Sequence, residues 1–334
     1  MKTMELVSNM KIGWNLGNTL DAMGEGLDSE CAWGNPKTTQ EMIDAVLAQG
    51  FNVIRIPVTW EGNFGAAPEF KIDDAWMKRV QEVVDYAYNR GAYVILNLHH
   101  EEWHFPSEEN QEAASAQLSA LWTQIANYFE SYGERLVFEG LNEPRKKGTP
   151  VEWNDGDEEG RKVVNHFAQV FVDTVRATGG NNKTRALMVT GYAAACCTNA
   201  LANIIIPKDD NLIVSVHAYK PYDFALNITG TSVWDAVKGA EEIDVVMKDI
   251  KELFLDKGIP VIIGEFGAMN KNNEADRVEW IQYYMKKTKE IGVPCIWWDN
   301  NEFTGDGEKF GFFDRAKMEF RYEKLLKAMM DAVK

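Results

Sequence analysis

Two glutamates, Glu143 and Glu265, stand at the ends of short apolar runs of the sequence, 135–142 and 260–266. If both runs are strands that end on the same side of a sheet, the two carboxyl groups can converge. An opposed pair of carboxyl groups is what cleavage of a glycosidic bond requires, because one protonates the leaving oxygen and the other attacks or stabilises the anomeric carbon. A lone glutamate in such a position more often caps a helix or joins a loop salt bridge, so the interpretation depends on its neighbours.

Other polar and aromatic residues stand at the ends of similar runs. Together with Glu265 they come from six of the eight predicted strands, and they are Arg55, His99, His100, Asn142, His217, Tyr219, Trp298, Asp299 and Asn300. Arg55 and Tyr219 can hydrogen-bond one carboxylate and keep it ionised. The negative charge of that carboxylate is then expected to raise the pKa of the other, which makes the second group a proton donor near neutral pH.

The runs that carry these residues alternate with helical patterns along the whole chain. Eight runs are mostly continuously apolar, as strands buried on both faces are, and they cover 12–17, 51–58, 93–99, 135–142, 186–192, 212–219, 260–266 and 293–299. Helical patterns cover 38–50, 73–91, 116–133, 161–180, 233–258, 275–292 and 321–334, with a short, poorly marked helix near 198–205. This alternation predicts an α/β fold, a single (β/α)8 TIM barrel domain over residues 1–334.

The alternative of a doubly wound open sheet lacks support. No G-x-G-x-x-G follows the first predicted strand, and the sequence contains no P-loop. In a barrel the site lies at the carboxyl ends of the strands, where the residues above gather. The barrel is therefore the fold that the sequence favours.

Charge and composition restrict the partners. The 334 residues include 35 Lys and Arg against 51 Asp and Glu, for a formal net charge of −16. This balance argues against nucleic acid and against an anionic membrane surface as partners. No run approaches 18 apolar residues, so no membrane span is expected. The four cysteines fit neither a disulfide framework nor a zinc site and are interpreted as free thiols: Cys31, Cys196, Cys197 and Cys295.

Seven motifs resemble glycoside hydrolase family five, the large cellulase family of clan A, and most of all its endoglucanase branch from anaerobic bacteria. In chain order they are GWNLGNTLD, NVIRIPVTW, LNLHHE, GLNEP, VHAY, IGEFGA and WWDNN. The resemblance runs from about residue 10 to 315, in the order of the family. Asn-Glu-Pro alone is a weak motif, but together with the other six it is highly specific.

The resemblance implies roles for individual residues. Glu143, in Asn-Glu-Pro, takes the role of acid/base, and Glu265 takes the role of nucleophile. The family retains the anomeric configuration, which implies carboxyl groups about 5–5.5 Å apart rather than the roughly 6.5–9.5 Å of inverting enzymes. The matching site positions are Arg55, His99, Asn142, His217, Tyr219 and Trp298. Asn18, in the first motif, and His100 are further candidates for substrate binding.

The eleven tryptophans fall into three groups. Trp76, Trp122 and Trp280 lie in helical patterns and are expected in the core, and Trp14 and Trp297 lie within strand runs. The other six lie in loops after strands or at strand ends, where indoles could stack on sugar rings: Trp33, Trp60, Trp103, Trp153, Trp234 and Trp298. Packing of the loops is the alternative for each of these except Trp298. Trp33 is expected toward the non-reducing side, and Trp153, in the loop 145–156, toward the leaving group.

These observations predict an endo-acting retaining β-glucanase, most simply an endo-β-1,4-glucanase that needs no cofactor. His99 and His100 suggest a metal, but if both lie in a strand they point to opposite sides, so no metal ligands are expected. Alternatives with the same mechanism are a xyloglucanase, a mixed-linkage β-glucanase, a xylanase or a mannanase. A non-catalytic carbohydrate-binding barrel and a metal-dependent hydrolase are the other classes considered.

The expected partner is a β-glucan polysaccharide or oligosaccharide, and the protein is expected to be a monomer. The N-terminal residues lack an apolar stretch long enough for a signal peptide. Two interpretations follow: the protein is cytoplasmic, or its export signal is not part of this sequence. Action on a polysaccharide favours a secreted or cell-surface location for the full-length protein.

Overall fold

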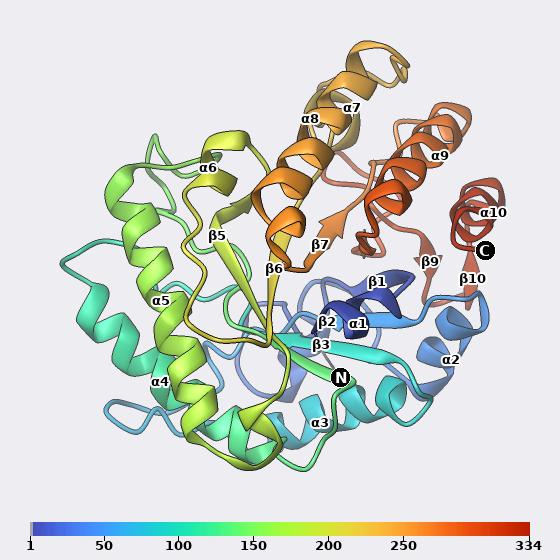
Figure 1. Ribbon diagram of the computed structural model, residues 1–334. Coiled ribbons are helices and arrows are strands. Elements are labelled where there is room, and N and C mark those ends of the chain that lie inside the picture. The colour runs from blue at the N-terminus through green and yellow to red at the C-terminus, as the bar shows by residue number, and fades with distance from the viewer. Residues whose placement is uncertain (1–2) are drawn as a thin grey trace.

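Eight parallel strands close into a barrel in which each strand pairs with its neighbours in the sequence and β8 pairs with β1 (Figure 1). The computed structural model describes residues 3–334. The strands are β1 (Ile12–Leu16), β2 (Val53–Ile56), β3 (Tyr93–Asn97), β4 (Leu136–Glu139), β5 (Leu187–Ala195), β6 (Leu212–His217), β7 (Val261–Phe266) and β8 (Cys295–Asp299). The predicted (β/α)8 TIM barrel is confirmed.

Helices surround the barrel (Figure 1). They are α2 (Gln40–Ala48), α3 (Asp74–Tyr88), α4 (Gln111–Tyr128), α5 (Glu158–Ala177), α6 (Thr198–Ala202), α8 (Lys238–Leu253), α9 (Glu274–Ile291) and α10 (Glu323–Ala332). The side chains of Thr39, Asp73 and Asp157 accept hydrogen bonds from backbone N–H groups at the starts of α2, α3 and α5, as helix caps do. Elements that the sequence analysis missed are α1 (Thr3–Ser8), α7 (Tyr222–Ala225), β9 (Phe313–Asp314) and β10 (Glu319–Phe320).

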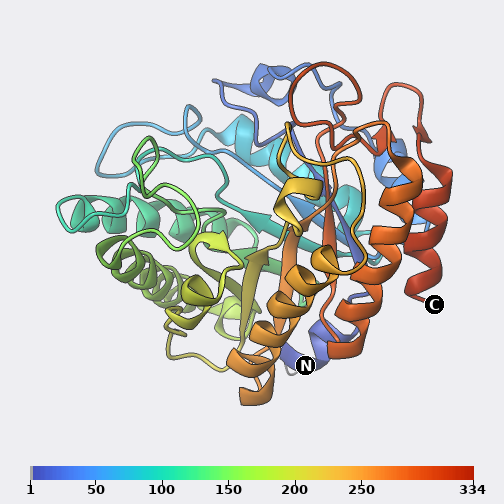
Figure 2. The same cartoon turned by 90° about the horizontal axis from the view of Figure 1, so that it is seen from above.

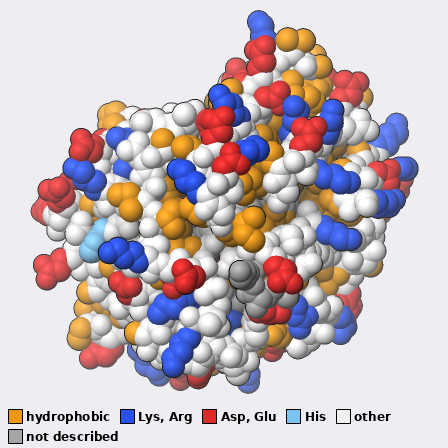
Figure 3. All heavy atoms as spheres, in the orientation of Figure 1, with side chains coloured by type: hydrophobic (Ala, Val, Ile, Leu, Met, Phe, Trp, Pro, Cys, Tyr) orange, Lys and Arg blue, Asp and Glu red, His pale blue; other side chains and the backbone are white. Residues whose placement is uncertain are grey.

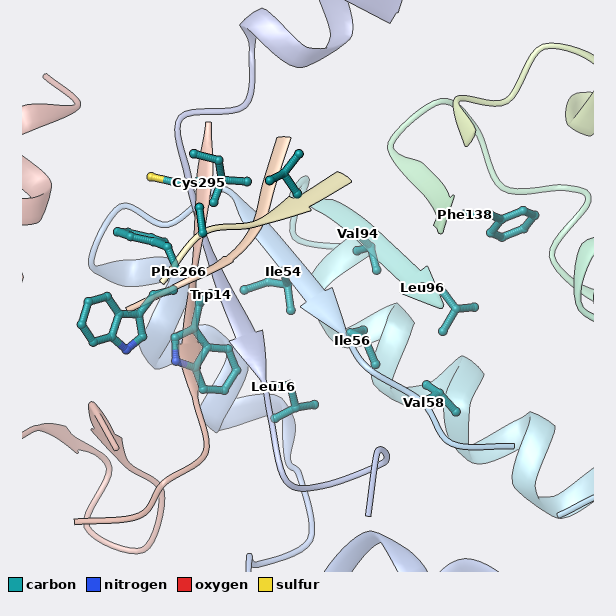
Figure 4. Packing of buried hydrophobic residues seen from close by; sticks show 14 of the residues in the cluster. Trp14, Leu16, Ile54, Ile56, Val58, Val94, Leu96, Phe138, Phe266 and Cys295 are labelled. Carbon is teal, nitrogen blue, oxygen red and sulfur yellow. The ribbon is translucent and has the colours of Figure 1, made fainter. Parts of the chain in front are cut away.

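Successive strand residues face either the helices or the barrel interior. Figure 4 shows the outer set, in which Trp14, Ile54 and Val94 pack into the large core shared with the helices. A second, separate core fills the interior near the starts of the strands and includes Val53, Leu6, Val7, Met10, Ile95, Val137, Met188, Ile213, Ile262 and Ile296. Because Leu6 and Val7 belong to α1, that helix closes the amino end of the barrel.

A β-bulge in β7 aims Glu265. Val216 pairs with Ile263 but His217 pairs with Glu265, so Gly264 is the extra residue. Strict alternation from the inward-facing Ile262 would turn Glu265 toward the helices, whereas the bulge turns it toward the barrel mouth. A Cβ on Gly264 would lie 2.8 Å from Ser215 Oγ, which explains the glycine at this position.

The loops that follow β1 and β8 lie together at one end of the molecule, away from the N-terminus (Figure 2). Figure 3 shows the face that carries the N-terminus, where acidic and basic side chains are interspersed rather than gathered into one patch. Among residues 3–334, no helix is long and apolar enough to cross a membrane.

Candidate active site

Glu143 and Glu265 meet at the carboxyl ends of β4 and β7. One oxygen of each carboxyl group lies within 4.8 Å of the other and of a ring nitrogen of His217. The side chains are 16% and 6% exposed, so both carboxyl groups are largely withdrawn from water. Carboxyl oxygens this close leave less room between the two groups than the roughly 6.5–9.5 Å of inverting glycosidases, as a retaining mechanism requires.

Glu265 is held by two donors from opposite sides of the barrel mouth. Arg55 Nη1 donates to Oε1 at 2.8 Å, and the Tyr219 hydroxyl donates to Oε2 at 2.8 Å. Burial and the charge of Glu265 raise the pKa of Tyr219 well above its ordinary value, so its hydroxyl stays protonated and remains a donor. The predicted contacts of Arg55 and Tyr219 with one carboxylate are therefore present in the structure, and that carboxylate is Glu265.

Glu143 has a different set of partners. Its Oε1 lies 2.7 Å from His217 Nδ1, and its Oε2 lies 3.5 Å from Arg145 Nη1. Burial opposes a positive charge on His217, but the carboxylates of Glu265 and Glu143 outweigh it and raise the pKa of His217 above its ordinary value. Burial would raise the pKa of Glu143, yet the hydrogen bond and charge of His217, with the charge of Arg145, lower it overall.

The prediction that the pKa of Glu143 is raised is wrong, because His217 and Arg145 lower it. Burial and the charge of Glu143 instead raise the pKa of Glu265, against the opposing effects of His217 and Arg55. The prediction followed from the charges of the two carboxylates alone, whereas the imidazole of His217 between them has the larger effect on the pKa of Glu143. Because Glu143 Oε1 lies 2.7 Å from His217 Nδ1, the carboxyl group and the imidazole titrate as one coupled pair.

Arg55 joins β4 to β7 inside the barrel, through Glu139 and Glu265. It is fully buried, and besides Glu265 it donates to Asn15 Oδ1 at 2.9 Å, Asn142 Oδ1 at 2.7 Å and Glu139 Oε2 at 2.7 Å. Each guanidinium nitrogen therefore has an acceptor in fixed geometry. The predicted site residue Asn142 thus contacts Arg55 and helps to fix it against Glu265.

Glu139 is a buried carboxylate that the sequence analysis missed. Its Oε2 also accepts from Asn97 Nδ2 at 3.0 Å, and its Oε1 accepts from Ser215 Oγ at 2.7 Å. Asn15, Asn97, Glu139 and Ser215 all lie within otherwise apolar strands and project into the interior. Polar residues at inward positions of a barrel strand are the signal that could have identified this supporting layer.

Replacing Glu139 by alanine is expected to lower the free energy of unfolding by about 3–5 kcal/mol, because it leaves the guanidinium of Arg55 buried without one of its charged partners. Chemical denaturation followed by circular dichroism measures the change. The matched control is Glu158→Ala, which removes an exposed partner of Lys162 and is expected to leave the free energy of unfolding nearly unchanged. Equal losses in the two variants would contradict a supporting role for Glu139.

Aromatic rings form a wall beside the two glutamates. Trp298 is 8% exposed, and the His99 ring lies parallel to its indole with centroids 5.8 Å apart. His100 packs against both His99 and Trp33, at 4.5 and 5.6 Å between ring centroids. Gly17 permits this packing, because a Cβ there would lie 2.9 Å from the indole of Trp298. The structure thus brings together four of the predicted sugar-binding side chains.

The remaining predicted positions differ in exposure. Trp153 is 52% exposed and lies in the loop after β4, as predicted. Trp60 and Trp234 are buried, so the packing alternative holds for both. Trp103 is partly buried, and its Nε1 donates to Glu101. Asn18 has a left-handed backbone, with φ of 57°, and the structure shows it shaping the loop after β1 through its backbone groups.

A cavity of about 330 Å³ opens next to Glu143, between the loops that follow β3 and β4. Its walls include His100 and Glu101, and the ion pair of Lys147 with Glu102 crosses from one loop to the other. Burial raises the pKa of Glu101 to about 8 and lowers that of His100 to about 4. The cavity therefore combines a buried carboxyl group and imidazole with the charged pair of Lys147 and Glu102, next to Glu143.

Two clusters in the described part of the chain have the spacing of metal ligands, Glu143 with His217 and Glu265, and Asp21 with His99 and His100. In the first cluster the hydrogen bonds described above engage every residue. In the second, both Asp21 oxygens accept backbone N–H groups, and His99 Nδ1 lies 3.1 Å from Asn97 Nδ2. The premise that His99 and His100 lie in a strand and point to opposite sides is wrong, because β3 ends at Asn97 and the centroids of the two rings lie 4.5 Å apart. That the site works without a metal stays a prediction.

Comparison with known proteins gives a consistent result. A family model described as cellulase (glycosyl hydrolase family 5) matches residues 20–304. Endoglucanase A of Ruminococcus albus is 52% identical over 94% of this chain and 88% of its own length, and endoglucanase B of Neocallimastix patriciarum is 51% identical over 99% and 72%.

Solved structures agree with these sequence matches. A GH5-4 broad-specificity endoglucanase from Ruminococcus champanellensis with bound cellotriose has a TM-score of 0.96 and 48% identity, covering 99% of this chain and 98% of that one. A xyloglucan-specific endo-β-1,4-glucanase from a metagenomic library has a TM-score of 0.96 and 43% identity, covering 98% of both chains. A lichenase from Caldicellulosiruptor sp. F32 has a TM-score of 0.95 and 42% identity, covering 99% of this chain and 95% of that one.

Proposed function

This chain belongs to glycosyl hydrolase family 5, the cellulase family, and is a retaining endoglucanase, and from that premise we propose how it works. The enzyme cleaves internal β-1,4-glucosidic bonds of cellulose and related β-glucans, with Glu265 as nucleophile and Glu143 as acid/base. The observation that supports the assignment best is the asymmetry between the two neighbouring carboxyl groups. Glu265 accepts from Arg55 and Tyr219, whereas Glu143 Oε1 lies 2.7 Å from the titratable imidazole of His217.

In the first step a Glu265 oxygen attacks the anomeric carbon as the bond from that carbon to the leaving oxygen breaks. The leaving oxygen takes a proton from Glu143, which receives it from His217 Nδ1 across 2.7 Å, so that Glu143 is left ionised and His217 neutral. The product is a neutral glycosyl ester on Glu265. Loss of that negative charge removes one of the two carboxylates that raise the pKa of His217.

In the second step a water molecule loses a proton to ionised Glu143 and attacks the anomeric carbon from the side opposite its ester bond to Glu265. The ester bond breaks and Glu265 leaves as a carboxylate, which Arg55 Nη1 and the Tyr219 hydroxyl again stabilise. Two displacements at one carbon restore the original configuration, as the retaining mechanism requires.

The aromatic residues bind successive sugar rings of the glucan. Trp298 lies beneath the sugar at the cleavage point, Trp33 and His100 contact the sugars toward the non-reducing end, and exposed Trp153 stacks on the leaving sugar. The faces of glucose rings are apolar while their edges carry hydroxyls, so a wall of indole and imidazole rings suits both. A neutral glucan also experiences no net repulsion from a chain with a charge of −16.

Purified enzyme is expected to release soluble oligosaccharides from carboxymethylcellulose and barley β-glucan, with an early fall in viscosity that shows internal cleavage. Xyloglucan is the second candidate, because one structurally similar protein is xyloglucan-specific. Product analysis by chromatography on these glucans, xylan and mannan measures the preference, with Glu265→Ala as the blank. Cleavage of xylan alone or mannan alone would contradict the glucanase proposal.

The location and assembly of the enzyme stay predictions. A polymeric glucan does not enter a cell, so we propose that the full-length protein acts outside it, secreted or on the cell surface. All the site residues named above belong to one chain, and we expect a monomer to be active.

A further inference from the structure

Arg145 lies two residues after Glu143 and contacts it twice. Its Nη1 donates to the backbone oxygen of Glu143 at 3.0 Å and lies 3.5 Å from the carboxylate Oε2. The side chains of both residues are 16% exposed, so water screens this pair only partly. Arg145 also lines the cavity beside Glu143, on the side proposed to receive the leaving sugar.

Two neighbours in the same loop fix the guanidinium. Arg145 Nε donates to Glu152 Oε1 at 3.1 Å, and Glu152 Oε2 accepts the backbone N–H of Gly148 at 2.9 Å. The plane of Trp153 covers the guanidinium, with Arg145 Cζ 4.2 Å from the ring centroid. A planar guanidinium suits a stacked site that also requires directed N–H donors, which a lysine ammonium cannot reproduce fully.

We propose that Arg145 is a positioning residue that orients the Glu143 carboxylate and stabilises its ionised form, from a place fixed by Glu152 and Trp153. The inference rests on the proposed role of Glu143 as acid/base. It adds a function for a residue that the two-carboxylate mechanism does not use. In the second step Glu143 must be ionised to accept a proton from water, and the charge of Arg145 favours that form.

Several charged or titratable groups face Glu143 from the surrounding strands. His217 comes from β6, Glu265 from β7, and His100 from the loop after β3, and each influences the Glu143 carboxylate together with Arg145. The charge of Glu143 also acts on Tyr219, after β6, and on Glu308, in the loop after β8. Whether the shared proton rests on Glu143 or His217, a nearby positive charge favours its loss. Without Arg145 the pair must therefore release the proton at higher pH.

The test is the pH profile of kcat/KM for Arg145→Met on a soluble β-glucan. The basic limb reports loss of the proton from the acid, and we expect it to move upward by about one pH unit. Arg145→Lys keeps the positive charge but loses the stacking on Trp153. Its basic limb is expected to lie close to that of the parent enzyme. Lys162→Gln removes an exposed cation on α5 and serves as the control, with an unchanged profile.

A basic limb of Arg145→Met that coincides with the parent, in a variant with an unchanged melting temperature, would overturn the inference. A loss of activity without movement of the limb would have the same meaning, because a purely structural role lowers the rate at every pH. Failure of the proposed function is distinguishable. In that case Glu143→Gln would hydrolyse glucan at the parental rate, whereas the inference alone fails if Glu143→Gln is inactive and the limb stays fixed.

Discussion

Replacing Glu265 by alanine is expected to lower kcat on β-glucan on the order of 10⁴–10⁶-fold, because no carboxylate remains to attack the anomeric carbon. The remaining contacts with the sugar come from the aromatic wall and the opposite loop, so binding of cellotetraose is expected to persist. Turnover measured by reducing-sugar release and binding measured by calorimetry separate the two effects.

Azide provides a control on this result. It fits the space of the removed carboxylate and can attack the anomeric carbon directly in Glu265→Ala, which forms an α-glycosyl azide by a single inversion. Glu252→Ala removes an exposed glutamate of α8 and is expected to match the parent. Parental turnover in Glu265→Ala would overturn the nucleophile assignment.

Glu143→Ala is expected to lower glucan hydrolysis by about 10²–10⁴-fold, the usual contribution of a general acid/base. With dinitrophenyl cellobioside the outcome differs, because dinitrophenolate leaves without a proton. The first step then proceeds, and a rapid burst of dinitrophenolate is followed by slow turnover limited by the second step. Stopped-flow absorbance measures the burst and the steady rate.

Azide again distinguishes the roles. In Glu143→Ala it attacks the glycosyl ester on Glu265 without base assistance, so the steady rate rises and the product is a β-glycosyl azide. The two alanine variants therefore give azides of opposite configuration. An α-glycosyl azide from Glu143→Ala would mean that the two glutamates have exchanged roles.

The sequence predicts the barrel well because its strands are short, apolar and separated by helices of clear periodicity. It predicts Glu143 and Glu265 as a pair because both end such strands. It does not predict the bulge at Gly264, since a glycine in a strand is compatible with several local structures, and only the pairing of His217 with Glu265 reveals it. Without that bulge, alternation alone would turn Glu265 toward the helices.

Hydrogen bonds between distant strands are the part of the site that the sequence leaves open. Glu139 and Arg55 are 84 residues apart, and their contact depends on the register and curvature of the closed barrel. The contact between Glu143 Oε1 and His217 Nδ1, 2.7 Å long, joins residues from two strands, and no spacing in the sequence encodes it. The pKa prediction for Glu143 failed for this reason.

The exposure of the loop tryptophans is also not predictable from the sequence. Trp153 and Trp60 both follow strands, yet one is 52% exposed and the other is fully buried. The Trp60 indole donates to the backbone oxygen of Asn97 at 2.9 Å, which fixes it inside the fold. Position in a loop after a strand therefore indicates the correct end of the barrel but not the exposure of the side chain.

Covalent trapping tests the central claim most directly. A dinitrophenyl cellobioside with fluorine in place of the hydroxyl at carbon 2 of the sugar to be transferred forms the glycosyl ester readily, but the fluorine slows its hydrolysis. Mass spectrometry of the intact protein and its peptides is expected to show one added fluorocellobiosyl group, on the peptide that contains Glu265. A label on any other residue, or unlabelled protein that releases products of inverted configuration, would contradict the account.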